Sequence, residues 1–145
     1  MTDAVVLDAG VLGQVSHPRR NPAFAQWFDR LLATNTTVYI AEIADYEVRR
    51  ELLRAERNEG VARLDRLKTV LPYLPLSTAI MLRAARLWAE ARKRGRPTAD
   101  PKELDCDVVL AAQAIEVSAV VVTDNIGHLS LFVDAKRWTD IVVGT

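Results

Sequence analysis

The feature that most constrains the fold is a pair of uninterrupted apolar segments that each stop at an acidic residue. Residues 4–7 are followed directly by Asp8, and residues 119–123 are followed directly by Asp124. Apolar runs without polar alternation are typical of strands covered on both faces, as in the parallel sheets of α/β proteins. Ligands of such sheets bind at the carboxyl ends of the strands. The two acids are therefore expected beside a binding crevice, although Asp8 could equally do no more than cap a following turn.

The rest of the chain alternates between helical and extended patterns. Asn21, and either Ser77 or Thr78, are suited to cap helices, and Gly95 is suited to end one. Strands that alternate with helices favour a parallel α/β sheet, and 145 residues suit one domain over residues 1–145. Helices are predicted at residues 22–32, 43–57, 61–71 and 78–94, with an alanine-rich helix starting near 105. Further strands are predicted at residues 37–40, 73–76 and 141–143.

Other carboxylates lie at or near the starts of these helices. Glu47 could lean back over the sheet edge, since helical side chains point toward the N-terminus of their helix. The adjacent Arg49 and Arg50 favour instead a surface ion pair. Asp105 and Asp107 stand at the expected start of the alanine-rich helix, where one would cap the helix. The other would then need a cation or a hydrogen-bond donor.

These acids form a set of oxygen ligands without thiolate or imidazole. Oxygen-only sites select hard cations, so the set predicts Mg²⁺ or Mn²⁺, and zinc is disfavoured. The single Cys106 excludes an internal disulfide and is expected to be a buried small hydrophobe without a chemical role. His128 is expected to make a structural hydrogen bond and not to bind metal.

Charge and hydropathy exclude some classes of protein. Nineteen basic and nineteen acidic residues cancel, so the net charge gives no sign of nucleic-acid binding, although local patches can still bind phosphate. Two such patches exist, one at the end of the helix predicted at residues 78–94 and one in the loop before Asn21. Interaction with the helix dipole would explain the first equally well, and exposure of the loop to solvent would explain the second. No apolar run is long enough to span a membrane and no basic leader is present, so a cytoplasmic protein is expected. The candidate phosphate-binding residues are Arg92, Arg94, Arg96, Arg19 and Arg20.

The acids in their sequence contexts resemble the PIN domain family, and in particular the VapC-type toxins of type II toxin–antitoxin systems. The resemblance covers nearly the whole chain, and it implies a doubly wound parallel sheet of order 3-2-1-4-5 flanked by helices. It places Asp8, Glu47 and Asp107 at metal-site positions. At the fourth position the family pattern selects Asn125, with Asp124 beside it. The matching segments are VVLDAG, ADYEVRREL, DCDVVLAAQA and VVTDNIGHLSLF.

The resemblance also implies an activity and partners. The expected reaction is hydrolysis of RNA phosphodiester bonds by metal-activated water, with Asp8 and Asp107 as direct ligands. Glu47 would bind the metal directly, hold metal-bound water, or help to take its proton. The chain would be a Mg²⁺- or Mn²⁺-dependent endoribonuclease, the toxin partner of a cognate antitoxin, and a homodimer. One bound metal ion is expected in the absence of substrate. Because Asn125 adds no negative charge, the alternative is a catalytically weak PIN-like module that binds RNA or protein.

A phosphotransfer enzyme or a receiver domain would also place acids around Mg²⁺ at the ends of parallel strands. The segment Asp8-Ala9-Gly10 lacks the second aspartate of the haloacid-dehalogenase phosphatases. No acid pair with a strand-terminal lysine marks a receiver domain. Both classes are therefore disfavoured.

Overall fold

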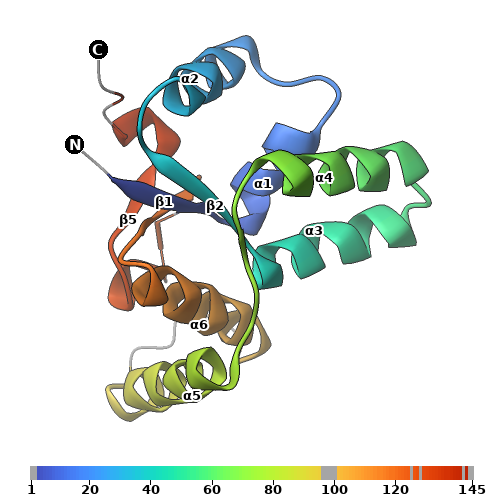
Figure 1. The fold of residues 1–145 in the computed structure, drawn as a ribbon. Helices are drawn as coiled ribbons and strands as arrows, with labels where there is room; N and C mark the ends of the chain where they lie inside the picture. The colour runs from blue at the N-terminus through green and yellow to red at the C-terminus, as the bar shows by residue number, and fades with distance from the viewer. Residues whose placement is uncertain (1–2, 96–100, 125, 128, 142, 144–145) are drawn as a thin grey trace.

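The structure is a computed structural model that describes residues 3–95, 101–124, 126–127, 129–141 and 143, and its centre is a five-stranded sheet (Figure 1). All neighbouring strands pair in parallel, in the order β3-β2-β1-β4-β5. The predicted order 3-2-1-4-5 is thus confirmed. The order reverses between the two central apolar strands, which is where doubly wound sheets open a crevice. The strands are β1 (Ala4–Leu7), β2 (Thr37–Ala41), β3 (Tyr73–Leu74), β4 (Val120–Thr123) and β5 (Ala135–Arg137).

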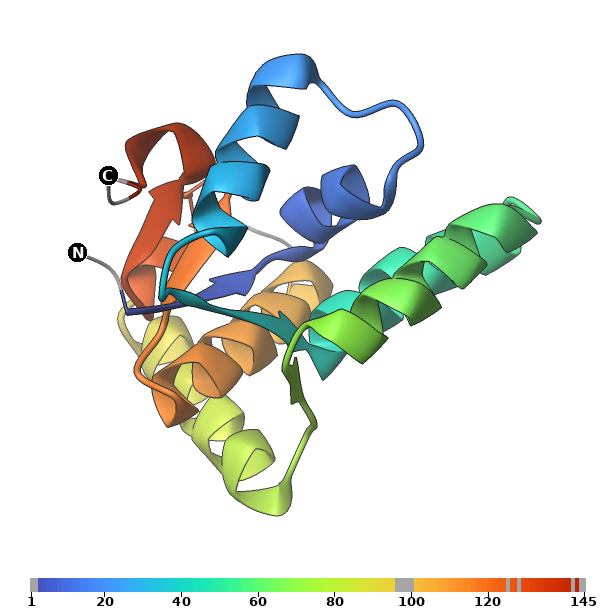
Figure 2. The same cartoon turned by 45° about the horizontal axis from the view of Figure 1, so that its top comes forward.

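Helices cover both faces of the sheet. Figures 1 and 2 show α1 and α2 on one face and α6 on the other, with α5 outside α6, while α3 and α4 form a hairpin that projects beyond the strand ends. Two short 3₁₀ helices follow β4, η1 (Leu129–Leu131) and η2 (Trp138–Asp140). The α-helices are α1 (Ala9–Ser16), α2 (Pro22–Leu32), α3 (Glu42–Arg54), α4 (Asn58–Val70), α5 (Thr78–Lys93) and α6 (Pro101–Glu116).

The predicted helix ends agree with the structure at three positions. Asn21 caps α2 by accepting the N–H of Ala23 at 2.8 Å, and Ser77 caps α5 by accepting the N–H of Ile80 at 3.1 Å. Gly95 follows α5 with a positive φ of 65°, a conformation that glycine adopts without steric cost. None of the helices in the described part of the chain is long and apolar enough to cross a membrane.

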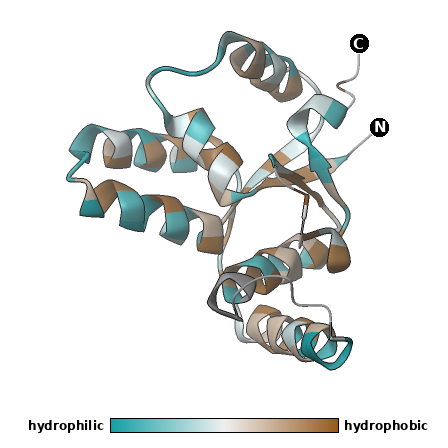
Figure 3. Cartoon of the chain, turned by 180° about the vertical axis from the view of Figure 1, so that it is seen from behind, coloured by the Kyte–Doolittle hydropathy of each residue, from teal (hydrophilic) through white to brown (hydrophobic). Residues whose placement is uncertain are grey.

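The hydrophobic core has two parts. The larger part encloses the sheet, and it includes the fully buried Val6, Leu7 and Phe24. The smaller part lies between α5 and α6, with Ile80 and Val109 among its buried residues. The α3–α4 hairpin carries many hydrophilic residues along its length, as the hydropathy colouring shows (Figure 3). Its contacts with the body include Leu64 of α4, which is buried in the larger core, and Arg63, whose Nε donates to the carbonyl of Ser16 in α1 at 2.8 Å.

A buried ionic cluster joins the base of the hairpin to the edge of the sheet. Asp45 of α3 is only 4% exposed; it accepts a hydrogen bond from the hydroxyl of Tyr73 in β3 at 2.8 Å and pairs with Lys68 of α4 at 3.0 Å. Arg49 lies 3.0 Å from the same carboxylate. Burial raises the pKa of Asp45, but the hydrogen bonds from Tyr73 and Lys68 and the charge of Arg49 outweigh it and hold the pKa below its ordinary value.

The prediction of a last strand at residues 141–143 is wrong. The last strand is β5, which precedes Trp138, and the described part of 141–143 lies outside any strand. Trp138 packs edge-on against Phe24 of α2, with ring centroids 5.4 Å apart, and begins a 3₁₀ helix that leads the chain away from the sheet. Strand β5 lies at the edge, where exposed residues such as Lys136 and Arg137 are tolerated, so its composition did not indicate a strand.

Candidate active site

The acids that follow β1 and β4 lie at the same end of the sheet, beside the carboxyl ends of these two strands. The backbone N–H of Asp8 donates to the carbonyl of Val122 at 3.0 Å, which continues the pairing of these two strands. Asp124 follows directly after Thr123, the last residue of β4. Both acids therefore stand at the point where the strand order reverses, the position at which open α/β sheets bind their ligands.

Asp8 caps helix α1, and its carboxyl group has a raised pKa. Its Oδ1 accepts the N–H of Val11 at 2.8 Å, so it caps α1, where the sequence had suggested only a turn. Burial raises the pKa of this carboxyl; a hydrogen bond from Thr123 and the N–H of Val11 lower it, and the charge of Asp124 raises it again. The net shift is upward, so the ionised form lacks full compensation within the protein.

Glu47 lies close enough to both Asp8 and Asp107 for its charge to interact with theirs. Glu47 is half-buried on α3, and burial raises the pKa of its carboxyl. Arg50 lowers that pKa, while Asp107 and Asp8 raise it. Elements far apart in the sequence thus bring together three carboxylates, Asp8, Glu47 and Asp107, which we call the acidic cluster.

The chemistry of the acidic cluster fits a hard divalent cation. Within the described residues, no group of three or more His, Cys, Asp or Glu side chains lies close enough together to hold a metal ion. The donors are nevertheless all carboxylate oxygens. Burial and the charge of Asp124 raise the pKa of Asp8, and burial and the charges of Asp107 and Asp8 raise the pKa of Glu47. A cation between them would remove that electrostatic cost, and oxygen donors suit Mg²⁺ or Mn²⁺.

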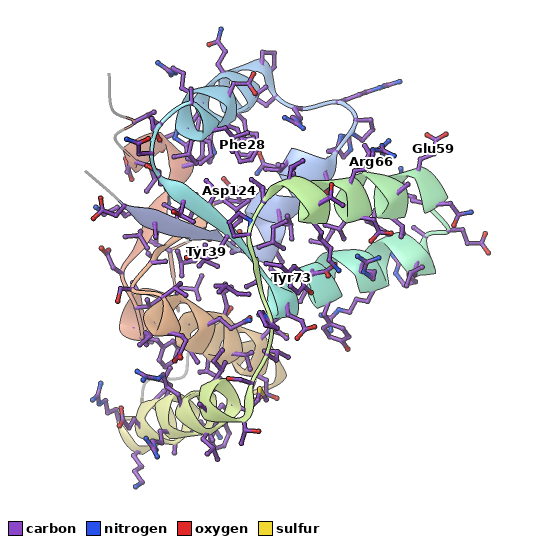
Figure 4. The ribbon with its side chains drawn as sticks, viewed as in Figure 1. Phe28, Tyr39, Glu59, Arg66, Tyr73 and Asp124 are labelled. Carbon is purple, nitrogen blue, oxygen red and sulfur yellow. The ribbon has the colours of Figure 1, made fainter. Side chains whose placement is uncertain are left out.

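The fourth predicted position is described only in part. Asp124 is exposed and accepts a hydrogen bond from the side-chain amide of Gln14 on α1. Figure 4 shows Asp124 beside α1, near the ends of the central strands. Asn125 and His128 lie outside the described residues, so their predicted roles stay predictions.

The start of α6 corrects two expectations. The helix begins at Pro101, so Asp105 and Asp107 lie inside it and neither caps it. Cys106 is half-buried and not fully buried, and it hydrogen-bonds to Glu47. Burial and the charge of Glu47 raise the pKa of its thiol to about 11, so the thiol stays protonated and acts as a donor. The sequence did not predict this contact, because it joins α3 to α6 across the fold.

A cleft of about 630 Å³ lies between α1 and the α3–α4 hairpin and reaches Glu47. Its α1 wall consists of small residues, and a side chain added at Gly13 would meet open space. The hairpin wall carries arginines that the sequence analysis had not selected, because a charged helix usually has a solvated face. Only the folded hairpin places them together. They are Arg50, Arg54, Arg57 and Arg63.

The five arginines predicted to bind phosphate lie in different places. Arg19 and Arg20 line a depression of about 510 Å³ that shares Gly10 and Gly13 of α1 with the cleft. Arg92 stacks on Trp88 with its guanidinium carbon 5.4 Å from the ring centroid, and Arg94 lines another depression, near Phe132. Neither lines the cleft beside Glu47, and Arg96 lies outside the described residues.

The raised pKa of Glu47 predicts a gain in stability when its charge is removed. Because the folded state disfavours the ionised carboxylate, Glu47→Gln should raise the melting temperature of the metal-free protein at neutral pH. The difference should shrink as the pH falls through the raised pKa, since the unaltered carboxyl then becomes neutral as well. Thermal unfolding in EDTA at several pH values measures this. Glu51→Gln, on the same helix and paired with Arg54, is the control and should show no gain; a lower melting temperature for Glu47→Gln would contradict the prediction.

Comparisons with known proteins agree with this architecture. The sequence model of the PIN domain matches residues 5–130. None of the curated proteins matches the chain at a significant level. Among solved structures, VapBC2 from Rickettsia felis, bound to a DNA fragment from their promoter, is 19% identical, with a TM-score of 0.76 over 93% of this chain and 98% of that chain. FitAcB from Neisseria gonorrhoeae is 21% identical, with a TM-score of 0.74 over 94% and 99%.

DNA-bound VapBC from Salmonella typhimurium is 19% identical, with a TM-score of 0.70 over 93% of this chain and 98% of that chain. At such identities the structural likeness shows the fold alone. The family match is stronger, because it extends over most of the sequence, from β1 to η1. On the strength of that match, the chain belongs to the PIN domain family.

Proposed function

We propose that this chain is a Mg²⁺- or Mn²⁺-dependent endoribonuclease and the toxin of a toxin–antitoxin pair. PIN domains are generally nucleases, which supports a hydrolase that cuts nucleic acid. The observation that carries the proposal is the acidic cluster at the carboxyl ends of the central strands, beside a cleft with an arginine-bearing wall. In such a site the carboxylates would bind a divalent metal ion, and the arginines would bind the phosphates of the nucleic acid.

Asp8, Glu47 and Asp107 would hold one divalent cation, and Asp124 or Asn125 would add a fourth group. The cation supplies positive charge at the phosphoryl group and lowers the pKa of a water molecule. Glu47 suits the role of proton acceptor, because burial raises its pKa toward the working pH. Asp8 is fixed in orientation by the N–H of Val11, so it needs no rearrangement when substrate arrives.

The RNA backbone would lie over α1, between two groups of arginines. Arg57 and Arg63 stand on the hairpin side of α1, and Arg19 and Arg20 on the other side. The small residues of α1 would let the sugar–phosphate chain approach closely, and Gly13 has no neighbour that a Cβ would touch. Predicted contacts from Arg92 and Arg94, which do not line the cleft, would lie farther along the RNA.

Reversal of one charge in the cleft tests this path. Arg57→Glu should raise the KM for RNA about tenfold with little change in kcat. It should also reduce the slope of the logarithm of RNA affinity against the logarithm of salt concentration by about one. Arg83→Glu makes the same charge change on the exposed surface of α5, away from the cleft, and should have a much smaller effect. Equal effects of the two substitutions would show that only net charge matters.

An antitoxin partner is part of the proposal, because the similar solved structures include VapBC and FitAB assemblies. The homodimer and the cytoplasmic location belong to the same proposal. Expression of the chain alone should arrest growth of its host, and co-expression with the product of the adjacent gene should restore growth. A chain that is harmless alone would contradict the toxin role.

The activity itself is tested with the pure protein and total cellular RNA. New RNA ends should appear at defined positions when Mn²⁺ or Mg²⁺ is supplied and should be absent in EDTA. RNA binding without new ends under either metal would favour the alternative, a PIN-like module that binds RNA or protein without cutting. That alternative draws on the neutral Asn125, which would leave the site with less negative charge for a cation.

A further inference from the structure

Gln14 connects helix α1 to the acid that follows β4. It is half-buried in the second turn of α1, and its side-chain Nε2 donates a hydrogen bond to Oδ2 of Asp124. The same helix begins with Asp8 as its cap, held by the N–H of Val11. Helix α1 therefore orients two acids of the site, Asp8 through its first turn and Asp124 through a side chain one turn later.

The hydrogen bond from Gln14 acts against electrostatic repulsion between Asp124 and Asp8. Asp124 is exposed, and its negative charge raises the pKa of Asp8, so the two carboxylates repel each other. An exposed side chain without a contact keeps its rotamer freedom, and a like charge nearby biases it toward solvent. The hydrogen bond from Gln14 opposes this movement and keeps Asp124 beside the acidic cluster.

The neutral charge of the donor is also important. A lysine or arginine at position 14 would form an ion pair with Asp124 and compensate the charge that attracts a cation. The amide of Gln14 binds one carboxylate oxygen without adding charge, so the second oxygen keeps its capacity to bind a cation. Gln14 thus orients the carboxylate of Asp124 without neutralising its negative charge.

We propose that Gln14 is a positioning residue that holds Asp124 beside the acidic cluster, so that Asp124 supplies the fourth oxygen group of the cation site. This role rests on the proposed function, because it concerns the same cation site. It assigns the fourth position to Asp124, one of the two candidates that the sequence offered.

The test measures the binding of Mn²⁺ alone, without RNA, from the electron paramagnetic resonance signal of the free ion. Gln14→Leu removes the donor at similar size and should weaken Mn²⁺ binding about tenfold. Asp124→Asn should weaken it to a similar degree. The double variant should lose no more than either single variant, because both act through one contact. Gln26→Leu, on the exposed side of α2, is the matched control and should bind Mn²⁺ normally.

Every outcome of this experiment is decisive. Unchanged Mn²⁺ binding in Gln14→Leu, or losses that add in the double variant, overturn the positioning role; Gln14→Met serves as the donor-free variant if leucine prevents folding. Asp8→Asn distinguishes this failure from failure of the proposed function. If Asp8→Asn weakens Mn²⁺ binding and Gln14→Leu does not, only the role of Gln14 is wrong. If neither substitution weakens it, the cation site is wrong and the role of Gln14 falls with it.

Discussion

Asp8→Asn should reduce metal-dependent RNA cleavage by roughly 10³-fold and leave the fold unchanged. The loss follows from the removal of one negative charge from the acidic cluster, which weakens the hold on a cation. The fold should persist because asparagine caps helices as well as aspartate does, so the contact with the N–H of Val11 is kept. Initial rates of RNA cleavage at the Mn²⁺ concentration that just saturates the unaltered protein, together with circular dichroism, measure both parts of this prediction.

The control for this substitution is Asp29→Asn, which makes the same change on the exposed surface of α2. It should retain full activity. Full activity of Asp8→Asn would rule out the nuclease site at the ends of β1 and β4. A loss of activity accompanied by a loss of helical signal would mean that Asp8 acts through folding, so the two measurements must be made on the same preparation.

Asp45→Ala should lower the free energy of unfolding by about 3 kcal/mol at neutral pH. The substitution leaves the hydroxyl of Tyr73 and the charges of Lys68 and Arg49 without their shared acceptor at the base of the hairpin. The value lies at the low end for a buried ion pair, since Lys68 and Arg49 remain 31% and 26% exposed and can regain water. Urea denaturation of the metal-free protein measures it.

The effect of Asp45→Ala should depend on pH in a defined direction. The pKa of Asp45 lies below its ordinary value of 3.8, so its contribution to stability is complete above that value and is lost as the pH falls through the lowered pKa. The two proteins should therefore become more similar in stability in acid. Asp65→Ala removes a carboxylate that is 56% exposed and contacts Arg49 at 2.7 Å. Asp65→Ala should lower the free energy of unfolding by less than about 1 kcal/mol. A loss as large as that of Asp45→Ala would contradict the idea that burial makes the Asp45 contacts important.

The sequence predicted the centre of the fold better than its periphery. Strands β1 and β4 were predictable because both are buried on two faces, and such strands consist of unbroken apolar residues. The caps Asn21 and Ser77 were predictable because their contacts are local in the sequence. Strand β5 was missed because an edge strand tolerates exposed Lys136 and Arg137.

The sequence predicted the acidic residues of the candidate site but not the cleft beside them. The charge interactions that link Glu47 with Asp8 and Asp107 agree with the grouping that the family resemblance implied, and their roles remain proposals. The arginine-lined cleft could not be predicted, because it forms only when α3 and α4 fold back beside α1. The contact between Gln14 and Asp124, which are 110 residues apart, likewise has no local pattern in the sequence.

The double use of Asp8, as the cap of α1 and as an acid of the cluster, has a genetic consequence. Codons for aspartate and asparagine differ by a single base, so one transition would convert the gene into one that encodes a folded but inactive chain. If the chain is the toxin that we propose, cells that survive its expression should include some that make the full-length protein with this replacement, alongside cells with frameshifts and deletions. Under the same proposal, such a chain would still occupy the antitoxin, and a cell carrying both gene copies would release more of the active form.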